Sequence, residues 1–193
     1  MYKKVLLLAS VLVLLGCSQK KEGCGIQDKS DFEQLFTRDE VYHTALNNTQ
    51  KAQLMASFET KALLTATYLN PVFKNHSCQK RFKNELKNGE YFFVGVYIPN
   101  SEKNEFNTKG YSLTLDGLKP LEVKKLDKDD PLRYEMPMVD NWSTYYKVKF
   151  KKTPKNNFNL IFENDRFGRD ILNFSKGEKP LFESLTDLNR EQN

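Results

Sequence analysis

The sequence predicts a mainly β protein: an antiparallel β-sandwich, Ig-like or similar, with one or two short helices. Two observations predict this class. In the second half of the chain, short segments rich in aromatic and β-branched residues alternate with turn-forming segments such as Pro154-Lys155-Asn156-Asn157. No helix-length segment separates these consecutive strand candidates, which excludes the alternating strand and helix pattern of a parallel sheet.

The predicted domain, 30–176, begins with a helix. Ser30-Asp31-Phe32-Glu33 has the form of a capping box, in which the serine caps the helix and the glutamate reaches back to it. Apolar residues follow at roughly helical spacing. We predict a helix near 31–37, and Asn47-Asn48 would stop any continuation toward residue 46.

Two structures are open for the segment Ala52–Tyr68. Its even positions are mostly apolar and its odd positions mostly polar, which is the period of a half-buried strand. Met55, Phe58 and Ala62 also share one stripe of a helix, so a helix over 50–64 is the alternative. The Thr-Ala-Thr-Tyr end favours a strand, and a strand is the prediction.

A second helix is predicted over 72–88. Pro71 opens it, an apolar stripe runs along a basic segment, and Gly89 is a suitable stop. The residues of that stripe are Phe73, Cys78, Phe82 and Leu86.

The remaining elements of the domain are strands. The segment 91–98 is apolar on both faces, as is typical of a central strand. The shorter strands are predicted over 111–115, 121–126, 145–152, 158–163 and 170–174. A polar tail, 177–193, follows the domain.

The chain begins with the layout of an export signal. Lys3 and Lys4 precede an apolar run over residues 5–15, which is too short to cross a bilayer core of about 30 Å as a helix. Leu14-Leu15-Gly16-Cys17 closes this run and resembles the lipobox of bacterial lipoproteins, although that family usually has a smaller residue at the place of Leu15.

This resemblance implies that residues 1–16 are a signal peptide, that Cys17 carries lipid, and that 17–29 form a flexible tether. Two or three acyl chains would hold the mature chain on the membrane, whereas one chain alone binds only marginally. Ser18 follows the cysteine in place of the Asp that favours inner-membrane retention, so the resemblance implies the outer membrane.

Removing residues 1–16 leaves 177 residues of 193, enough for one domain with a core, and lowers the net charge from +5 to +3. Such a small excess does not indicate nucleic acid as a partner. Cys24 and Cys78 remain as a possible disulfide pair in an oxidising compartment. The bridge would close a loop of about 55 residues and stabilise the fold by about 4 kcal/mol; two free thiols are the alternative.

Motifs for catalysis and metal binding are not evident. The sequence has no GxSxG elbow, glycine-rich phosphate loop or HExxH, so we expect no enzyme activity, cofactor or metal. His43 and His76 are predicted surface residues. The acidic segment 127–130 lacks the ligand spacing of a calcium loop and is predicted to be a solvated turn ended by Pro131.

The segment 145–152 carries a basic face. Alternation places Tyr146, Val148 and Phe150 inward. It places Tyr145, Lys147, Lys149 and Lys151 outward. These lysines would bind phosphate-rich headgroups, an anionic envelope polymer or an acidic partner loop, or they would only protect an exposed edge strand from pairing.

Trp142, with Tyr145 and Tyr146, is a second candidate binding surface. The alternative is that these aromatic side chains fill the core, and exposure of Trp142 would favour an interface.

The expected function is that of a lipid-anchored, non-enzymatic accessory or scaffold subunit that binds another envelope protein. One alternative is a periplasmic lipoprotein that binds or inhibits a lipid, a glycan or an enzyme. A hydrolase with dispersed carboxylates is a further alternative.

Overall fold

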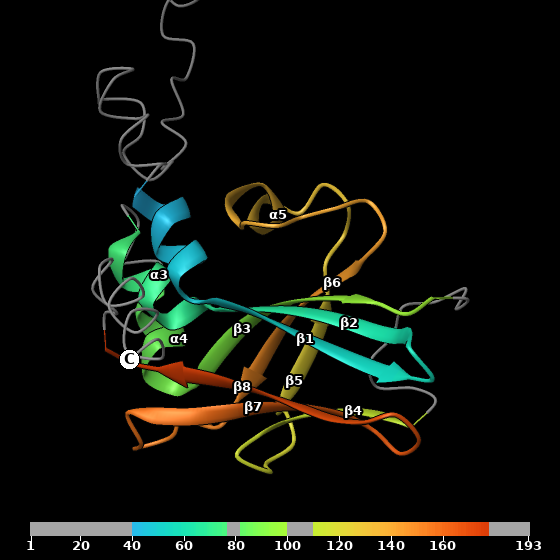
Figure 1. Ribbon diagram of the computed structural model, residues 1–193. Coiled ribbons are helices and arrows are strands. Elements are labelled where there is room, and N and C mark those ends of the chain that lie inside the picture. Colours follow the sequence, from blue (N-terminus) through green and yellow to red (C-terminus); the bar gives the residue numbers. More distant parts are fainter. Residues whose placement is uncertain (1–39, 77–81, 100–109, 178–193) are drawn as a thin grey trace, which may run out of the picture.

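The computed structural model describes residues 40–76, 82–99 and 110–177, which form two antiparallel sheets packed face to face (Figure 1). The larger sheet has the order β1-β2-β3-β6-β5, with β1 Thr49–Ala56, β2 Glu59–Tyr68, β3 Glu90–Tyr97, β6 Thr144–Phe150 and β5 Glu122–Lys125. The smaller sheet has the order β4-β7-β8, with β4 Tyr111–Leu115, β7 Asn157–Asn164 and β8 Gly168–Ser175. The predicted antiparallel β-sandwich with short helices is therefore confirmed.

The main core lies between the two sheets. Tyr146, Val148 and Phe150 of β6 point into it, as alternation predicted, and are buried. The facing side chains of the smaller sheet come from all three of its strands and include Leu113, Leu160 and Phe174. Burial of these apolar side chains is the main stabilising contribution to the sandwich.

The larger sheet also buries much of its second face. A second apolar cluster joins Phe93 and Tyr145 of the sheet to a helix over residues 40–47, to α3 (Leu69–Asn75) and to the segment 126–139. That segment contains α5 (Pro131–Glu135), which lies over this face in Figure 1. Because β3 is covered on both faces, its continuous apolar sequence confirms the prediction of a central strand.

The segment predicted as one strand from residue 52 is a hairpin of β1 and β2. The strand prediction is confirmed, and the helical alternative is wrong. A bulge explains why one alternation runs through both strands: Met55 pairs with Thr60 but Leu54 pairs with Ala62, so an extra residue is inserted. Even positions then lie opposite even positions, and the apolar side chains of both strands reach the same core.

The helices differ from those predicted. A single helix over 72–88 is wrong, because α3 ends at Asn75 and His76 is extended, and a separate α4 follows at Lys83–Asn88. Gly89 ends α4 as predicted; a Cβ there would lie 2.8 Å from the Phe150 carbonyl oxygen. The helix predicted over 31–37 lies outside the described residues. Within the described ranges, no helix is long and apolar enough to cross a membrane.

One side of the sandwich is closed by side chains that join β1 to β8. Gln50 exchanges hydrogen bonds with the backbone of Asn173, which donates its N–H to Gln50 Oε1 over 3.1 Å. The N–H of Gln53 donates to Asp170 Oδ2 over 3.0 Å. The backbone edge of β1 is therefore partly occupied and is not a free edge for an added strand.

Candidate functional site on the outer face of the larger sheet

The predicted basic face lies on the outer face of the larger sheet. Lys147 and Lys149 point away from the core, as predicted, and are half-buried, whereas Lys151 lies beyond the end of β6 and is exposed. Strand β6 lies between β3 and β5, so these lysines do not protect a free edge. Edge protection, the alternative reading of the basic face, does not apply to β6.

Tyr145 points outward as predicted but is covered, with only 2% of its surface exposed. Its ring stacks on Phe93, with centroids 5.1 Å apart, and the Arg133 guanidinium lies 4.8 Å from the ring centroid. A Cβ at Gly95 would lie 2.6 Å from Tyr145 Cε1, so the sheet needs glycine beneath the ring. Burial raises the pKa of the Tyr145 phenol.

Tyr145 anchors the loop that carries Trp142. Its hydroxyl accepts a hydrogen bond of 2.7 Å from the backbone N–H of Asp140. The Asp140 carboxylate accepts from the backbone N–H of Trp142 over 2.8 Å, and from the N–H and hydroxyl of Ser143 over 2.7 and 3.0 Å. These bonds form an Asx turn that holds the backbone of the loop in one conformation.

Trp142 is exposed over 75% of its surface, whereas Tyr145 and Tyr146 are buried. The core-filling alternative therefore holds for the two tyrosines and fails for the tryptophan. An aromatic side chain displayed on a loop that is fixed by hydrogen bonds is typical of an interaction surface, because little entropy is lost when it binds.

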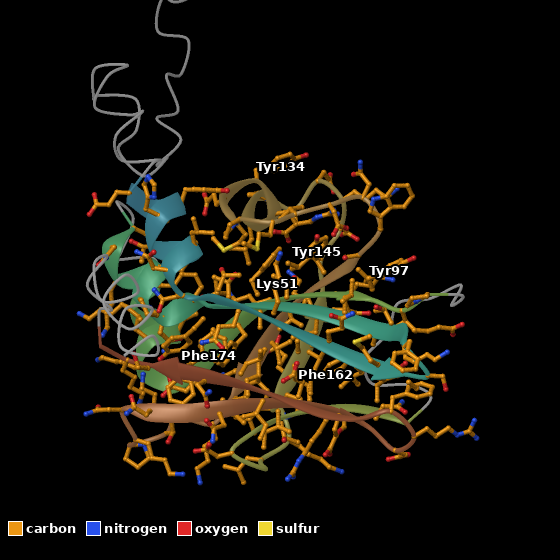
Figure 2. All side chains as sticks on the ribbon, in the orientation of Figure 1. Lys51, Tyr97, Tyr134, Tyr145, Phe162 and Phe174 are labelled. Atoms are coloured by element: carbon orange, nitrogen blue, oxygen red, sulfur yellow. The ribbon has the colours of Figure 1, made fainter. Side chains whose placement is uncertain are left out.

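A groove of about 540 Å³ lies between this loop and strands β1 to β3. We call it the Trp142 groove. Figure 2 shows Lys51, Tyr97 and Tyr145 on the side of the larger sheet that faces α5. The residues that line the groove are Lys51, Ala52, Leu63, Leu64, Thr65, Gly95, Tyr97, Met138, Asp140, Trp142 and Ser143.

Exposed apolar side chains surround the groove and continue along the β1–β2 hairpin. Leu63 and Met138 line the groove and are exposed together with Trp142. Met55 lies two positions from Gln53, the partner of Leu63, and thus on the same face nearer the turn. Phe58 occupies the turn itself and is fully exposed at a φ of 65°.

A second, polar pocket of about 460 Å³ lies between α4 and the β5–β6 pair. Its charged wall holds Lys147 and Lys149 of the predicted basic face together with Lys124 of β5 and carboxylates from α4 and β5. The lining residues are Asn84, Glu85, Asn88, Tyr91, Glu122, Lys124, Lys147 and Lys149. Alternation in the sequence marked Lys147 and Lys149, whereas no local pattern marked the α4 side chains, because only the tertiary structure brings that helix to the strand.

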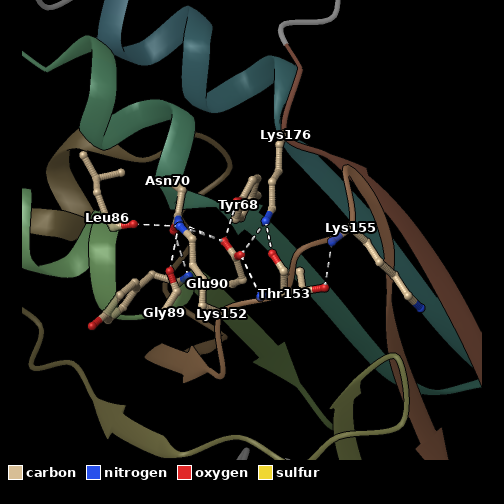
Figure 3. Close-up of polar contacts among 10 residues, drawn as sticks. Tyr68, Asn70, Leu86, Gly89, Glu90, Lys152, Thr153, Lys155 and Lys176 are labelled. Atoms are coloured by element: carbon tan, nitrogen blue, oxygen red, sulfur yellow. Dashed lines mark hydrogen bonds and ion pairs between the residues drawn. The ribbon is translucent and has the colours of Figure 1, made fainter.

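A third polar feature, the buried Glu90, has no local signal in the sequence (Figure 3). Its Oε2 accepts hydrogen bonds from the Tyr68 hydroxyl over 2.7 Å and from Asn70 Nδ2 over 2.9 Å. Its Oε1 accepts from the backbone N–H of Thr153 over 3.1 Å and lies 2.9 Å from Lys176 Nζ. Burial and the Glu90 carboxylate raise the pKa of Tyr68.

Both oxygens of Glu90 are fully occupied by donors and the side chain has no exposed surface. The carboxylate therefore joins β2, β3, the β6–β7 connection and the residue after β8, instead of facing a substrate. A hydrolase would need two close carboxylates in one cleft. Among the described residues, the polar contacts of Glu90 are with donors and not with a second carboxylate.

The remaining residues singled out from the sequence lie either outside the described residues or in local contacts. Cys17, Cys24 and Cys78 lie outside the described residues, so lipidation and the disulfide stay predictions. His43 is exposed, and His76 Nε2 lies 3.6 Å from Glu135 Oε2. In the acidic segment, Asp130 accepts from the N–H of Leu132 over 3.0 Å and caps α5, a role that sequence analysis missed. Among the described residues, no group of three or more metal-ligating side chains is assembled.

No protein-family model, curated protein or solved structure matches this chain. The class of protein is therefore defined by its fold alone, a β-sandwich with a covered outer face, and its function is inferred from the residues on that face.

Proposed function

We propose that the protein is a lipid-anchored accessory or scaffold subunit of the cell envelope, whose sandwich domain docks onto another envelope protein through the Trp142 groove. The occupant of the groove would be a protein segment that presents large apolar side chains. The observation that carries this proposal is the exposed Trp142 on a loop held by the Asp140 carboxylate.

The composition of the surface supports a protein partner. Aromatic and methionine side chains are enriched at the centres of protein interfaces, and tryptophan is among the residues enriched at energetic hot spots. Met138 and Trp142 lie on the loop side of the groove, and Leu63 and Tyr97 lie on the strand side. Their exposure costs free energy in the isolated domain, and a docked segment would remove it.

The extent of the apolar surface favours a protein over a small ligand. Exposed apolar residues run beyond the groove to Met55 and Phe58 on the hairpin, so a partner that touches them must be larger than the groove. Phe58 adopts a positive φ that is unfavourable for a residue with a side chain. Because glycine would fit this turn better, an aromatic residue at its exposed tip favours a binding role.

Strand addition at β1 is a poor alternative to docking on the face. Gln53 donates its backbone N–H to Asp170, so β8 already takes part of this edge. Lys51 and Asp140 place opposite charges in the groove. These charges can fix the position of a docked segment along the groove, in addition to its apolar contacts.

The envelope location is part of the same proposal and is supported by the lipobox resemblance at Cys17. Lipid on this cysteine would keep the sandwich close to membrane-bound partners and raise their effective concentration. The Cys17→Ser variant tests the anchor separately: it is expected to lose palmitate labelling and to leave the membrane fraction.

Docking is tested by crosslinking in intact cells, followed by purification of the lipidated protein and mass spectrometry. We expect one stoichiometric envelope protein, with Trp142→Ala lowering its yield about tenfold or more, as for hot-spot residues. Tyr134→Ala is the matched control, because Tyr134 is 67% exposed but does not line the groove.

Equal losses in the two variants, or no co-purified protein from either, would contradict the docking proposal. Retention of a lipid or glycan that is lost only in Trp142→Ala would assign the groove to a ligand instead. Since Trp142 is exposed, its variant is expected to keep the unfolding temperature of the parent protein, which separates loss of docking from loss of folding.

A further inference from the structure

The polar pocket between α4 and β5–β6 is distinct from the Trp142 groove and shares no lining residue with it. We infer that this pocket binds a phosphate ester, with Lys124 and Lys149 as the principal cations. The inference goes beyond the docking function and does not depend on it.

The strand register brings the lysines together. Lys124 of β5 pairs with Lys147 of β6, so two ammonium side chains stand directly opposite on the outer face. Lys149 lies two positions along β6 and pairs with Glu122. Three positive side chains and the Glu122 carboxylate therefore occupy adjacent places at the base of the pocket.

Aromatic rings direct two of the ammonium groups. Lys147 Nζ lies 5.5 Å from the Phe73 ring centroid and 5.2 Å from that of Tyr91. Lys149 Nζ lies 5.7 Å from the same Tyr91 centroid. Two like charges thus converge on one ring, an arrangement that cation–π attraction stabilises only in part.

The charge of this pocket is compensated incompletely. Lys147 Nζ lies 3.8 Å from Glu85 Oε1, whereas no ion pair within 4.0 Å joins Lys124 or Lys149 to a carboxylate in the described part of the chain. Like charges directly opposite on neighbouring strands are destabilising. A bound anion would reduce this repulsion between Lys124 of β5 and Lys147 of the interior strand β6.

The pocket matches a phosphate ester in charge and size. Three lysines and two glutamates line it, which leaves one net positive charge, opposite in sign to the charge of a phosphate ester. Asn84 and Asn88 of α4 add amide donors to its wall. The volume of about 460 Å³ leaves room for an organic group beside the phosphate, and the Tyr91 ring lines the same pocket.

Phosphate esters have two sources in a cell, lipid headgroups and free phosphorylated molecules. The test uses the chain from residue 17 with Cys17→Ser, so that no lipid anchor contributes to binding. Glycerol 3-phosphate is titrated by calorimetry and NMR, and vesicles of phosphatidylcholine with or without phosphatidylglycerol are tested by co-sedimentation.

We expect binding of glycerol 3-phosphate that weakens with added salt, and an affinity about tenfold lower in Lys124→Gln and in Lys149→Gln. The matched control is Lys125→Gln, which removes a lysine of the same strand that does not line the pocket. Sedimentation with phosphatidylglycerol vesicles that follows the same pattern assigns a lipid headgroup, and binding of glycerol 3-phosphate alone assigns a free ester.

Absence of binding in both assays would overturn the inference, and so would equal losses in Lys124→Gln and Lys125→Gln. Folding provides an independent readout. Because Lys124→Gln removes a repulsive cross-strand pair, its unfolding temperature without phosphate is expected to equal or exceed that of the parent protein. A fall in that temperature would contradict the repulsion on which the inference rests.

Discussion

Replacing Glu90 by glutamine is expected to destabilise the sandwich by about 3–5 kcal/mol. The substitution keeps the size of the side chain but removes the charge that Lys176 meets at 2.9 Å, a bond worth about 2 kcal/mol. The new amide nitrogen must also face donors: Thr153 and Lys176 on one side, or Tyr68 and Asn70 on the other. The unsatisfied donors cost about 1–3 kcal/mol more.

Urea unfolding measures this change as a lower midpoint with an unchanged slope. The matched control is Glu163→Gln, a half-buried carboxylate on β7 that accepts one hydrogen bond of 2.9 Å from Ser112, and its expected loss is below about 1 kcal/mol. In a double-mutant cycle with Lys176→Met, we expect a coupling energy of about 1–3 kcal/mol. A loss below about 1 kcal/mol in Glu90→Gln, or a coupling energy near zero, would refute the assigned role of the network.

Two further predictions concern the hairpin and pH. Phe58→Gly is expected to raise the free energy of unfolding, measured in urea, by about 1 kcal/mol, because φ is 65° at this position. The control Glu59→Gly, in the following strand, is expected to lower it. An unchanged or lower stability in Phe58→Gly would contradict strain at the turn. Burial raises the pKa of Tyr68, Tyr111 and Tyr145, so above about pH 10 the unfolded state releases protons that the folded state keeps, and stability falls as pH rises. Lys152, whose pKa is lowered by burial, opposes this fall, but it is an exposed residue. Urea unfolding from about pH 8 to about pH 11 should show the fall, with a shallower slope in Tyr68→Phe, and phenolate absorbance that appears fully before unfolding would contradict it.

Local patterns were sufficient for most strands. The period-2 alternation of β4, β6 and β7 places one face on the core, and the unbroken apolar sequence of β3 marks a strand covered on both faces. The hairpin between β1 and β2 escaped detection because Ser57 and Phe58 are not residues typical of a tight turn, and because the bulge preserves the alternation across it.

The candidate sites were predictable only in part. Trp142, Lys147 and Lys149 were singled out from the sequence, because residue type and alternation show which side chains bear aromatic surface or charge. Whether Trp142 is displayed and Tyr145 covered depends on the segment 126–143 folding over the sheet, a contact that no local pattern encodes.

The sequence by itself determined the class of fold, the inward and outward faces of the strands, and the resemblance to a lipoprotein signal at Cys17. These properties follow from neighbouring residues, whose periodicity reports which side of a strand is apolar. The tertiary structure alone decided that Lys124 faces Lys147, that the Arg133 guanidinium lies over the Tyr145 ring, and that Glu90 meets Lys176. Each of those contacts joins residues of different elements, and the order of strands in a sheet is set by packing of the whole chain.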